Sequence, residues 1–133
     1  QVIQQRIEYF TTLADVKNIK FIDKINKNVR ILIDEKKISK LIDNLISNAI
    51  KYNKINGFIK VTLNDNQIII EDSGKGIKKE QLALLFDRYS RFDKTVGGFG
   101  IGLNIVSMIC KEYNLNINIS SKIDVGTKVE ITW

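Results

Sequence analysis

The sequence predicts an α+β fold, a two-layer sandwich in which helices cover one face of a mixed, mostly antiparallel sheet. One observation is that strand-like runs come in pairs joined by short polar turns, as at 64–66, which is typical of antiparallel hairpins. A second is that helical patterns separate these pairs, most clearly over 38–50, where apolar residues recur every three or four positions. The absence of proline, low-complexity segments and internal repeats favours one domain.

The first predicted elements are a helix and two strands. Residues 1–14 carry apolar side chains at helical spacing. We expect residues 1–15 to be the tail of a preceding helix or a linker, and residues 16–133 to form the domain proper. The runs Asn18–Asp23 and Val29–Ile33 predict two strands separated by a polar turn.

The clearest predicted helix begins near Ile38, and its apolar residues form one continuous stripe. Asp34 or a neighbour can cap its start, and the polar, glycine-containing stretch 53–57 ends it. Two strands follow, over Phe58–Leu63 and Gln67–Glu71, and the turn between them makes a hairpin.

The rest of the chain predicts two more helices and a closing strand pair after a glycine loop. The order of elements is therefore α-ββ-α-ββ-α-α-ββ. The later elements are a short helix from about Lys78 to Leu85, an irregular segment over 86–99, a helix from about Gly100 to Tyr113, and strands Leu115–Ser121 and Thr127–Trp133 around a turn containing Gly126.

Composition is typical of a soluble globular domain, with 133 residues, 44% hydrophobic and 27% charged. No apolar run approaches the ~18 residues that a membrane span needs, so we expect no direct membrane contact by this part of the chain. The first residue is not Met, which leads us to expect a piece of a longer polypeptide. The net charge is +6, but the lysines are scattered among acids, which favours attraction of a nucleotide or an acidic protein partner over nucleic acid.

The counts of cysteine and histidine exclude several kinds of site. One cysteine cannot form an internal disulfide, and Cys110, within an apolar stretch, is expected to be a plain buried thiol. With no histidine, the chain can form neither a Cys/His metal site nor a Ser-His-Asp triad.

The first candidate site lies on the predicted helix, within Asn44-Leu-Ile-Ser-Asn48-Ala-Ile-Lys51-Tyr52. At 100° per residue, its polar residues gather on one flank of the apolar stripe. This flank is either a solvated helix edge or a site where an asparagine oxygen coordinates Mg²⁺ and a lysine meets a phosphate, because Mg²⁺ prefers hard oxygen ligands.

Two glycine-rich motifs follow. Asp72 opens Asp72-Ser-Gly74-Lys-Gly76, which is either a tight turn or a place where a carboxylate accepts a hydrogen bond from an exocyclic amine such as that of adenine. Gly98-Phe-Gly100-Ile-Gly102-Leu103 precedes an apolar helix and is either a hinge or a phosphate cradle at the helix start. Neither motif has the spacing of a P-loop or of a dinucleotide-binding fingerprint.

Together these motifs resemble the catalytic, ATP-binding domain of sensor histidine kinases, a branch of the gyrase, chaperone, histidine kinase and mismatch-repair ATPase superfamily. The helix motif resembles the N box of that family, the Asp72 motif its G1 box, and the Gly98 motif its G2 box. Leu85-Phe86-Asp-Arg88-Tyr-Ser-Arg91-Phe92 resembles its F box. The resemblance covers about residues 20–133 and implies the Bergerat-type ATP-binding fold.

The resemblance implies roles for the matching residues. Asn48 would hold Mg²⁺ with help from Asn44, and Asp72 would read adenine. The other implied ATP-site residues are Lys51 at a phosphate, Tyr52 and Ile77 near the nucleotide, Gly74 and Gly76 around adenine, Phe86 under a lid, Arg88 or Arg91 at the γ-phosphate, and Gly98, Gly100, Gly102 and Leu103 over the phosphates. The implied catalytic residues are Asn48, Lys51 and Arg88. Two features depart from the family pattern. The family often has a small or hydroxyl residue at the position of Phe99, and the expected lid, from about Phe92 to Phe99, is short.

The resemblance also implies a function, which is donation of the ATP γ-phosphate to a histidine of a dimerisation domain outside this sequence, and then to a response regulator. Hydrolases of the superfamily usually carry a glutamate four residues before the magnesium asparagine, where this chain has Asn44, which cannot act as a general base. Alternatives are an ATP-hydrolysing switch or a catalytically inactive nucleotide-binding module. The expected location is the cytoplasmic end of a membrane-anchored sensor.

Overall fold

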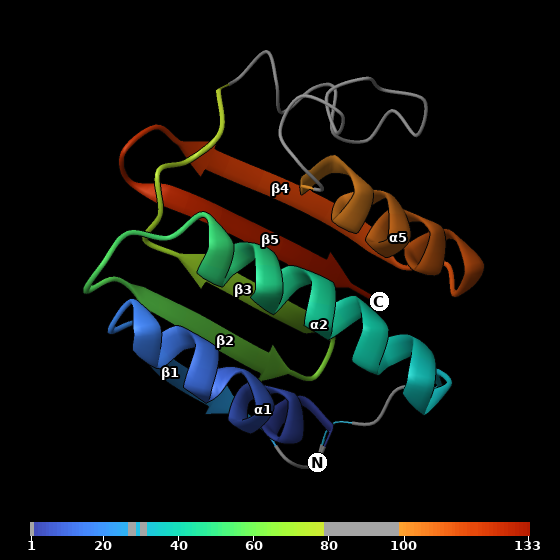
Figure 1. Cartoon of the computed structure of the whole chain (residues 1–133). Coiled ribbons are helices and arrows are strands. Elements are labelled where there is room, and N and C mark those ends of the chain that lie inside the picture. The colour runs from blue at the N-terminus through green and yellow to red at the C-terminus, as the bar shows by residue number, and fades with distance from the viewer. Residues whose placement is uncertain (1, 27–28, 30–31, 79–98) are drawn as a thin grey trace.

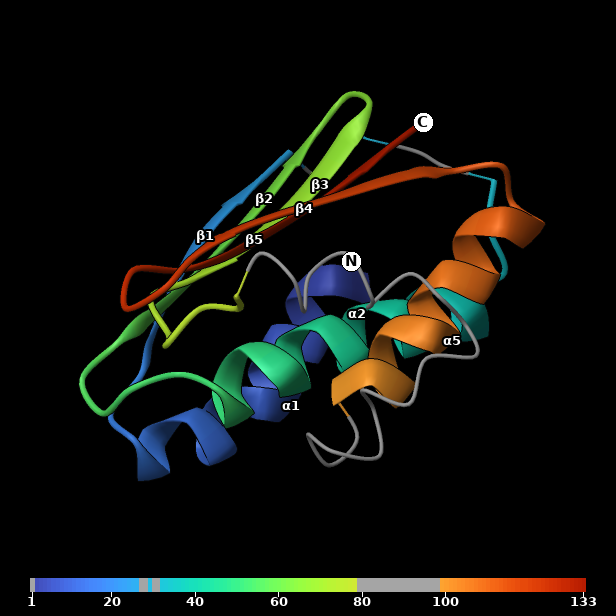
Figure 2. The same cartoon turned by 90° about the horizontal axis from the view of Figure 1, so that it is seen from above.

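The computed structural model describes residues 2–26, 29, 32–78 and 99–133. The fold has two layers, with one sheet and all three described helices on the same face of it (Figures 1 and 2). The sheet has five strands in the order β1-β2-β3-β5-β4. The elements are α1 (Val2–Val16), β1 (Lys20–Ile25), α2 (Glu35–Lys51), β2 (Phe58–Asn64), β3 (Gln67–Asp72), α5 (Phe99–Glu112), β4 (Asn116–Lys122) and β5 (Gly126–Thr132).

The sheet is mixed and mostly antiparallel, which confirms the predicted fold class. Only β1 and β2 pair in parallel, with Lys20 opposite Phe58. The pairs β2–β3, β3–β5 and β4–β5 are antiparallel. The parallel pair needs a crossover, and α2 supplies it, so this helix is held between two neighbouring strands of one sheet.

Helix α2 forms the centre of the core, as its sequence pattern predicts. Its start is capped by Asp34, whose Oδ1 accepts a hydrogen bond from the Lys36 N–H at 2.7 Å. The helix ends at Lys51, with Tyr52 as its C-cap. Seven residues of the stripe are buried, and they are Ile38, Leu41, Ile42, Leu45, Ile46, Ala49 and Ile50.

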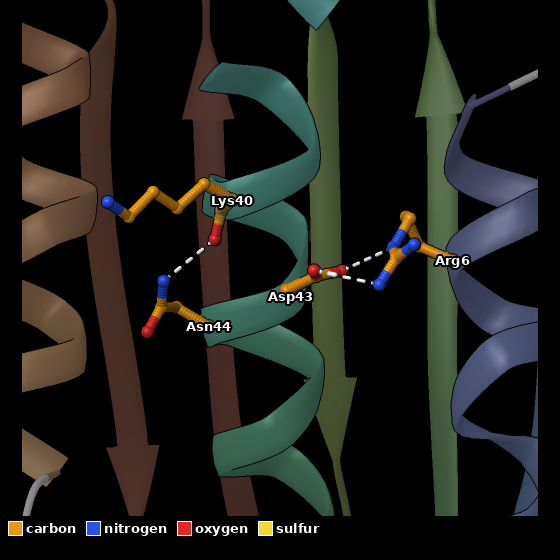
Figure 3. Close-up of polar contacts among 4 residues, drawn as sticks. All are labelled: Arg6, Lys40, Asp43 and Asn44. Atoms are coloured by element: carbon orange, nitrogen blue, oxygen red, sulfur yellow. Dashed lines mark hydrogen bonds and ion pairs between the residues drawn. The ribbon is translucent and has the colours of Figure 1, made fainter. Parts of the chain in front are cut away.

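Helix α1 packs beside α2 and contributes Ile3, Ile7, Phe10 and Ala14 to the same core. Arg6 of α1 forms a bidentate ion pair with Asp43 of α2, with Nε–Oδ1 at 2.6 Å and Nη2–Oδ2 at 2.9 Å (Figure 3). The boundary expected between residues 15 and 16 stays a prediction.

The predicted strand Val29–Ile33 is wrong. Residues 29, 32 and 33 lie outside any strand, and the Leu32 side chain is 99% exposed. Val29 and Ile33 are partly buried against the core without joining a ladder. The strand before them runs over Lys20–Ile25, two residues later than predicted, because Asn18 occupies a turn with φ of 54°.

The later elements match their predictions where the structure describes them. Helix α5 and strands β4 and β5 lie close to their predicted bounds, and Cys110 is a buried free thiol whose pKa burial raises to about 11. The short helix predicted from Lys78 to Leu85 lies outside the described residues beyond its first position, as does the irregular segment up to residue 98. None of the helices in the described ranges has the length and apolarity needed to cross a membrane.

Leu41→Ala tests the central position of α2. Leu41 is fully buried in the core, so its truncation should lower the free energy of unfolding by about 2–5 kcal/mol, measured by urea denaturation. Leu32→Ala removes the same atoms from a 99% exposed position and should change that free energy by less than about 0.5 kcal/mol. Equal effects of the two changes would contradict the packing described above.

Candidate functional site

The described segments that carry most of the predicted site residues meet at one end of the helical layer. The carboxyl end of α2, the loop that follows β3 and the β4–β5 turn lie at the same end of the molecule (Figures 1 and 2). Helix α5 runs opposite to α2, so its first residues also lie toward this end. The fold therefore brings together segments that are separated by up to about 75 residues in the sequence.

Asp72 is the last residue of β3, and its carboxyl group is largely removed from water. Its Oδ1 accepts a hydrogen bond from the Gly74 N–H at 2.8 Å. Burial raises the pKa of Asp72 to about 6, and nearby Glu71 adds to this rise, although backbone N–H groups of Gly74 and Thr127 oppose it. A desolvated carboxylate with capacity for further hydrogen bonds is a strong acceptor for a ligand N–H group.

The loop after β3 is fixed by hydrogen bonds on both sides. The Lys75 N–H donates to the Tyr52 carbonyl at 3.3 Å, which ties the loop to the end of α2. On the other side, the Lys75 carbonyl accepts from the Asp124 N–H at 2.9 Å, and the Ile77 N–H donates to Ser121 Oγ at 2.8 Å. The loop that carries Gly74 and Gly76 is thus held between α2 and the β4–β5 hairpin.

The two glycines of this loop leave no room for a side chain. A Cβ on Gly74 would lie 2.4 Å from the Tyr52 carbonyl oxygen and 2.8 Å from Asp72 Oδ1. Gly76 has φ of +74°, and a Cβ there would lie 2.2 Å from the Lys122 carbonyl oxygen. The sequence motif therefore reflects close backbone approach around Asp72, as its glycines predict.

A buried polar pair supports the same loop and was not predicted from the sequence. Asn53 and Ser73 are 8% and 5% exposed, and Ser73 Oγ donates to Asn53 Oδ1 at 3.1 Å. Asn53 Nδ2 donates to the Phe58 carbonyl at 3.0 Å, and the Phe58 N–H donates to Ser73 Oγ at 2.8 Å. These bonds join the end of α2, the start of β2 and the end of β3, and thereby position Asp72. The only feature of the sequence that pointed to Asn53 and Ser73 was their position next to or within the motifs of Asn48 and Asp72.

The polar flank of α2 faces α5, opposite to the flank that pairs with α1 (Figure 3). Asn44 Nδ2 donates to the Lys40 carbonyl at 2.7 Å. Asn48, one turn later, has a buried Nδ2 that finds no hydrogen-bond partner among the residues described. An unpaired buried amide costs about 1–3 kcal/mol, which a ligand that binds the amide can offset.

Two lysines lie near the aromatic ring of Tyr52, at the end of this flank. Lys51 Nζ lies 5.4 Å and Lys75 Nζ 5.2 Å from the centre of the half-buried Tyr52 ring. Two cations near a flat aromatic ring suit a ligand that has both an anionic part and a planar part.

Several predicted site residues cannot be placed. Phe86, Arg88, Arg91 and Gly98 lie outside the described residues. Gly100, Gly102 and Leu103 fall in the first turns of α5, where the structure describes the backbone. The first N–H groups of a helix lack partners within the helix, so this end of α5 can bind an anion. The described ranges contain no cluster of three or more acidic, cysteine or histidine side chains that could hold a metal ion.

Comparison with known families places the chain in a family of ATPases. Residues 33–133 match the family model described as histidine kinase-, DNA gyrase B- and HSP90-like ATPase. Because the match covers most of the chain, the protein belongs to this ATPase family.

The individual relatives are sensor histidine kinases. The chain is 33% identical over 97 residues to sensor protein QseC of Escherichia coli, which covers 72% of this chain and 22% of QseC. It is 31% identical over 139 residues to sensor histidine kinase WalK of Bacillus subtilis, which covers 97% of this chain and 21% of WalK. The chain therefore spans about a fifth of the length of these two relatives, and the predicted resemblance to the catalytic, ATP-binding domain is confirmed.

Solved structures share the fold. The nucleotide-free catalytic domain of histidine kinase ThkA superposes with a TM-score of 0.83 at 24% identity, over 98% of this chain and 88% of that chain. The cytoplasmic segment of histidine kinase QseC superposes with a TM-score of 0.75 at 20% identity, over 99% of this chain and 72% of that chain.

Gly126→Ala tests the close packing around Asp72. Gly126 has φ of +143°, and a Cβ there would lie 1.9 Å from the Asp72 carbonyl oxygen. The change should lower the free energy of unfolding by about 1–3 kcal/mol, measured by urea denaturation, because the backbone of β3 must move. Val125→Ala alters the neighbouring, 58% exposed residue and should leave that free energy almost unchanged. A fully stable Gly126→Ala protein would contradict the contact.

Proposed function

We propose that this domain binds ATP with Mg²⁺ at the end of the helical layer and donates the γ-phosphate to a histidine outside this sequence. The observation that carries the proposal is the Asp72 carboxyl, which is desolvated and held by the Gly74 N–H at the bottom of a glycine-lined loop. Membership of the ATPase family supports ATP as the ligand.

The adenine ring would lie against the loop after β3. Asp72 would accept a hydrogen bond from the exocyclic amine, because its second carboxylate oxygen retains capacity for a donor. Gly74 and Gly76 would allow the ring to approach the backbone, and the Tyr52 region would form the neighbouring wall. Ile77, which is half-buried beside this loop, would add an apolar contact.

The phosphates and Mg²⁺ would lie between α2 and the start of α5. Asn48 fits the metal role, because its buried Nδ2 lacks a partner among the described residues, and a half-turn of the amide would bring its oxygen to that position. Bound Mg²⁺ would neutralise charge on the phosphates and orient them. Asn44 would assist from the preceding turn, Lys51 would contact a phosphate, and the first N–H groups of α5, at Gly100, Gly102 and Leu103, would hold the others. By the family resemblance, Phe86 would pack under the lid, Arg88 or Arg91 would approach the γ-phosphate, and Gly98 would cover the phosphates.

Donation to another group fits the site better than rapid hydrolysis. Asn44 stands where a hydrolase would need a base, and a neutral amide cannot take a proton from water. Its Nδ2 is also bonded to the Lys40 carbonyl. Phosphoryl transfer mainly needs positioning and charge neutralisation, and a histidine acceptor supplies its own nucleophile.

The whole protein would extend beyond this domain. The sequence holds no histidine, so the acceptor would belong to a dimerisation domain of the full-length chain, which would then pass the phosphoryl group to a response regulator. We assign the domain to the cytoplasmic end of a membrane-anchored sensor, and we propose no role in nucleic-acid binding.

Asp72→Asn separates binding from stability. The variant presents an N–H group or a weaker oxygen to the adenine amine, so its affinity for a non-hydrolysable ATP analogue should fall at least about tenfold by calorimetry. Its affinity would equal that of wild type if Asp72 did not touch the nucleotide. Asp65→Asn makes the same change in the exposed β2–β3 turn and should leave the affinity unchanged.

The difference in stability between Asp72→Asn and wild type should depend on pH. The folded-state pKa of Asp72, about 6, lies above the ordinary 3.8, so between these values the folded protein binds more protons than the unfolded chain. The ionised carboxylate therefore lowers stability most above pH 6, and the penalty disappears as pH falls toward 3.8. Asp72→Asn should unfold at a higher temperature than wild type at pH 7.5, and the gap should close by pH 4.

Asn48→Ala tests the metal assignment. ATP-analogue affinity of the wild-type domain should rise on addition of Mg²⁺, and this gain should shrink about tenfold or more in Asn48→Ala, measured by calorimetry with Mg²⁺ and with EDTA. Ser47→Ala changes the adjacent, exposed residue and should keep the full gain. An undiminished Mg²⁺ effect in Asn48→Ala would reject Asn48 as a ligand.

Phosphoryl transfer is tested directly by mixing this domain with the separately made histidine-bearing domain of the full-length protein and ATP labelled at the γ-phosphate. The expected product is an acid-labile, base-stable phosphohistidine on the partner, with little free phosphate when the partner is left out. Rapid phosphate release by the domain alone would identify an ATP-hydrolysing switch instead.

A further inference from the structure

We propose that Lys17 is a positioning residue of the nucleotide site, which caps the carboxyl end of α2 and thereby holds the loop that carries Gly74 and Gly76. Lys17 follows α1 directly and lies far from the sequence motifs. The inference rests on the nucleotide site proposed above, and it assigns to Lys17 no contact with the nucleotide.

The Lys17 ammonium group binds three carbonyl oxygens at the end of α2. Nζ donates to Ile50 at 3.0 Å, to Lys51 at 2.9 Å and to Asn53 at 3.4 Å. An ammonium group has three N–H donors, so these bonds use its full capacity. The last carbonyls of a helix lack hydrogen-bond donors within the helix and carry partial negative charge. A cation with N–H groups supplies both the donors and the opposite charge.

The fourth carbonyl of this stretch belongs to the site. Residues 50–53 present four successive carbonyls, and the one that Lys17 leaves, at Tyr52, accepts the Lys75 N–H at 3.3 Å. Lys17 and the nucleotide loop therefore bind the same turn from different sides. Loss of the ammonium group would remove a donor from three carbonyls of that turn, of which the Ile50 carbonyl would keep the Asn53 N–H at 3.2 Å, and would thereby loosen the Tyr52 carbonyl that fixes Lys75.

The backbone beside Lys17 fixes the position of its side chain. The Lys17 carbonyl accepts the Asn56 N–H at 2.9 Å, and Asn18 Nδ2 donates to Asn56 Oδ1 at 2.6 Å. Asn18 and Asn56 both have positive φ, 54° and 66°, which asparagine tolerates better than most residues. The segment after α1 and the segment after α2 are thus joined by two hydrogen bonds besides those of the Lys17 ammonium group.

Lys17→Met tests the proposal, since it keeps the aliphatic stem and removes the ammonium group. The affinity of the folded domain for a non-hydrolysable ATP analogue should fall about tenfold by calorimetry, and hydrogen exchange at the Lys75 amide should become at least about tenfold faster. Lys17→Arg, which restores a cation with several donors, should recover most of both losses.

Two control variants distinguish a positioning role of Lys17 from a general effect of its charge and from a loss of global stability. Lys20→Met removes the same charge from an exposed position three residues away and should leave the affinity unchanged. Leu41→Ala lowers global stability and should leave the affinity of the folded fraction unchanged. Wild-type affinity and unchanged Lys75 exchange in Lys17→Met would overturn the proposal, as would an equal loss of affinity in Lys20→Met.

The readouts also distinguish this proposal from the proposed function. Hydrogen exchange at the Lys75 amide is measured without nucleotide. If the wild-type domain failed to bind the ATP analogue, the proposed nucleotide site would be rejected, but the exchange rate would still show whether Lys17 holds the loop. If Lys17→Met does not fold, a measurement on the wild-type protein still tests the proposal. Its three bonds should slow exchange of the Lys17 ammonium protons enough to show an NMR signal that shifts when the analogue binds, and an unshifted signal would overturn the role.

Discussion

The packing of α2 against the sheet is the constraint on which the rest of the structure depends. Seven apolar side chains of this helix are buried, and Leu41, Ile42 and Ile46 have no exposed surface. This burial fixes the rotation of the helix about its axis, because turning it would carry the stripe into water. The polar flank with Asn44 and Asn48 is then necessarily directed toward α5, and the carboxyl end of the helix necessarily meets the loop after β3.

Polar contacts at that end convert a packed helix into a defined site. Asn53 and Ser73 are buried but hydrogen-bonded, so they incur little desolvation penalty and fix the geometry of three chain segments. Asp72 differs, because burial raises its pKa and leaves the ionised carboxyl in an unfavourable environment. Such a locally unfavourable group, supported by a well-satisfied surrounding network, is common at ligand sites.

The sequence allowed the fold class, the α2 stripe, its Asp34 cap and the β2–β3 hairpin to be predicted, because each depends on neighbours within a few residues. The strand predicted at Val29–Ile33 was wrong because a short apolar run after a polar turn does not distinguish a strand from isolated contacts with the core. The motif residues on α2 and after β3 were identified from the family resemblance. Ser73 and Lys17 were missed because their side chains bond residues 15 or more positions away, and Asn53 was missed because it acts through its bond to Ser73, 20 residues away. No local pattern in the sequence records such pairs.

The parallel pairing of β1 with β2 has a consequence for how the domain is delimited. The family match begins at residue 33, after both α1 and β1. A chain trimmed to that match would leave β2 at the edge of the sheet, with a row of unpaired N–H and carbonyl groups beside buried Ile59 and Val61. Such an edge recruits strands from other molecules, whereas β1 presents the exposed charges of Lys20 and Lys24 at the border. Strand β1 therefore protects the edge of β2 from pairing with other molecules, in addition to forming part of the sheet.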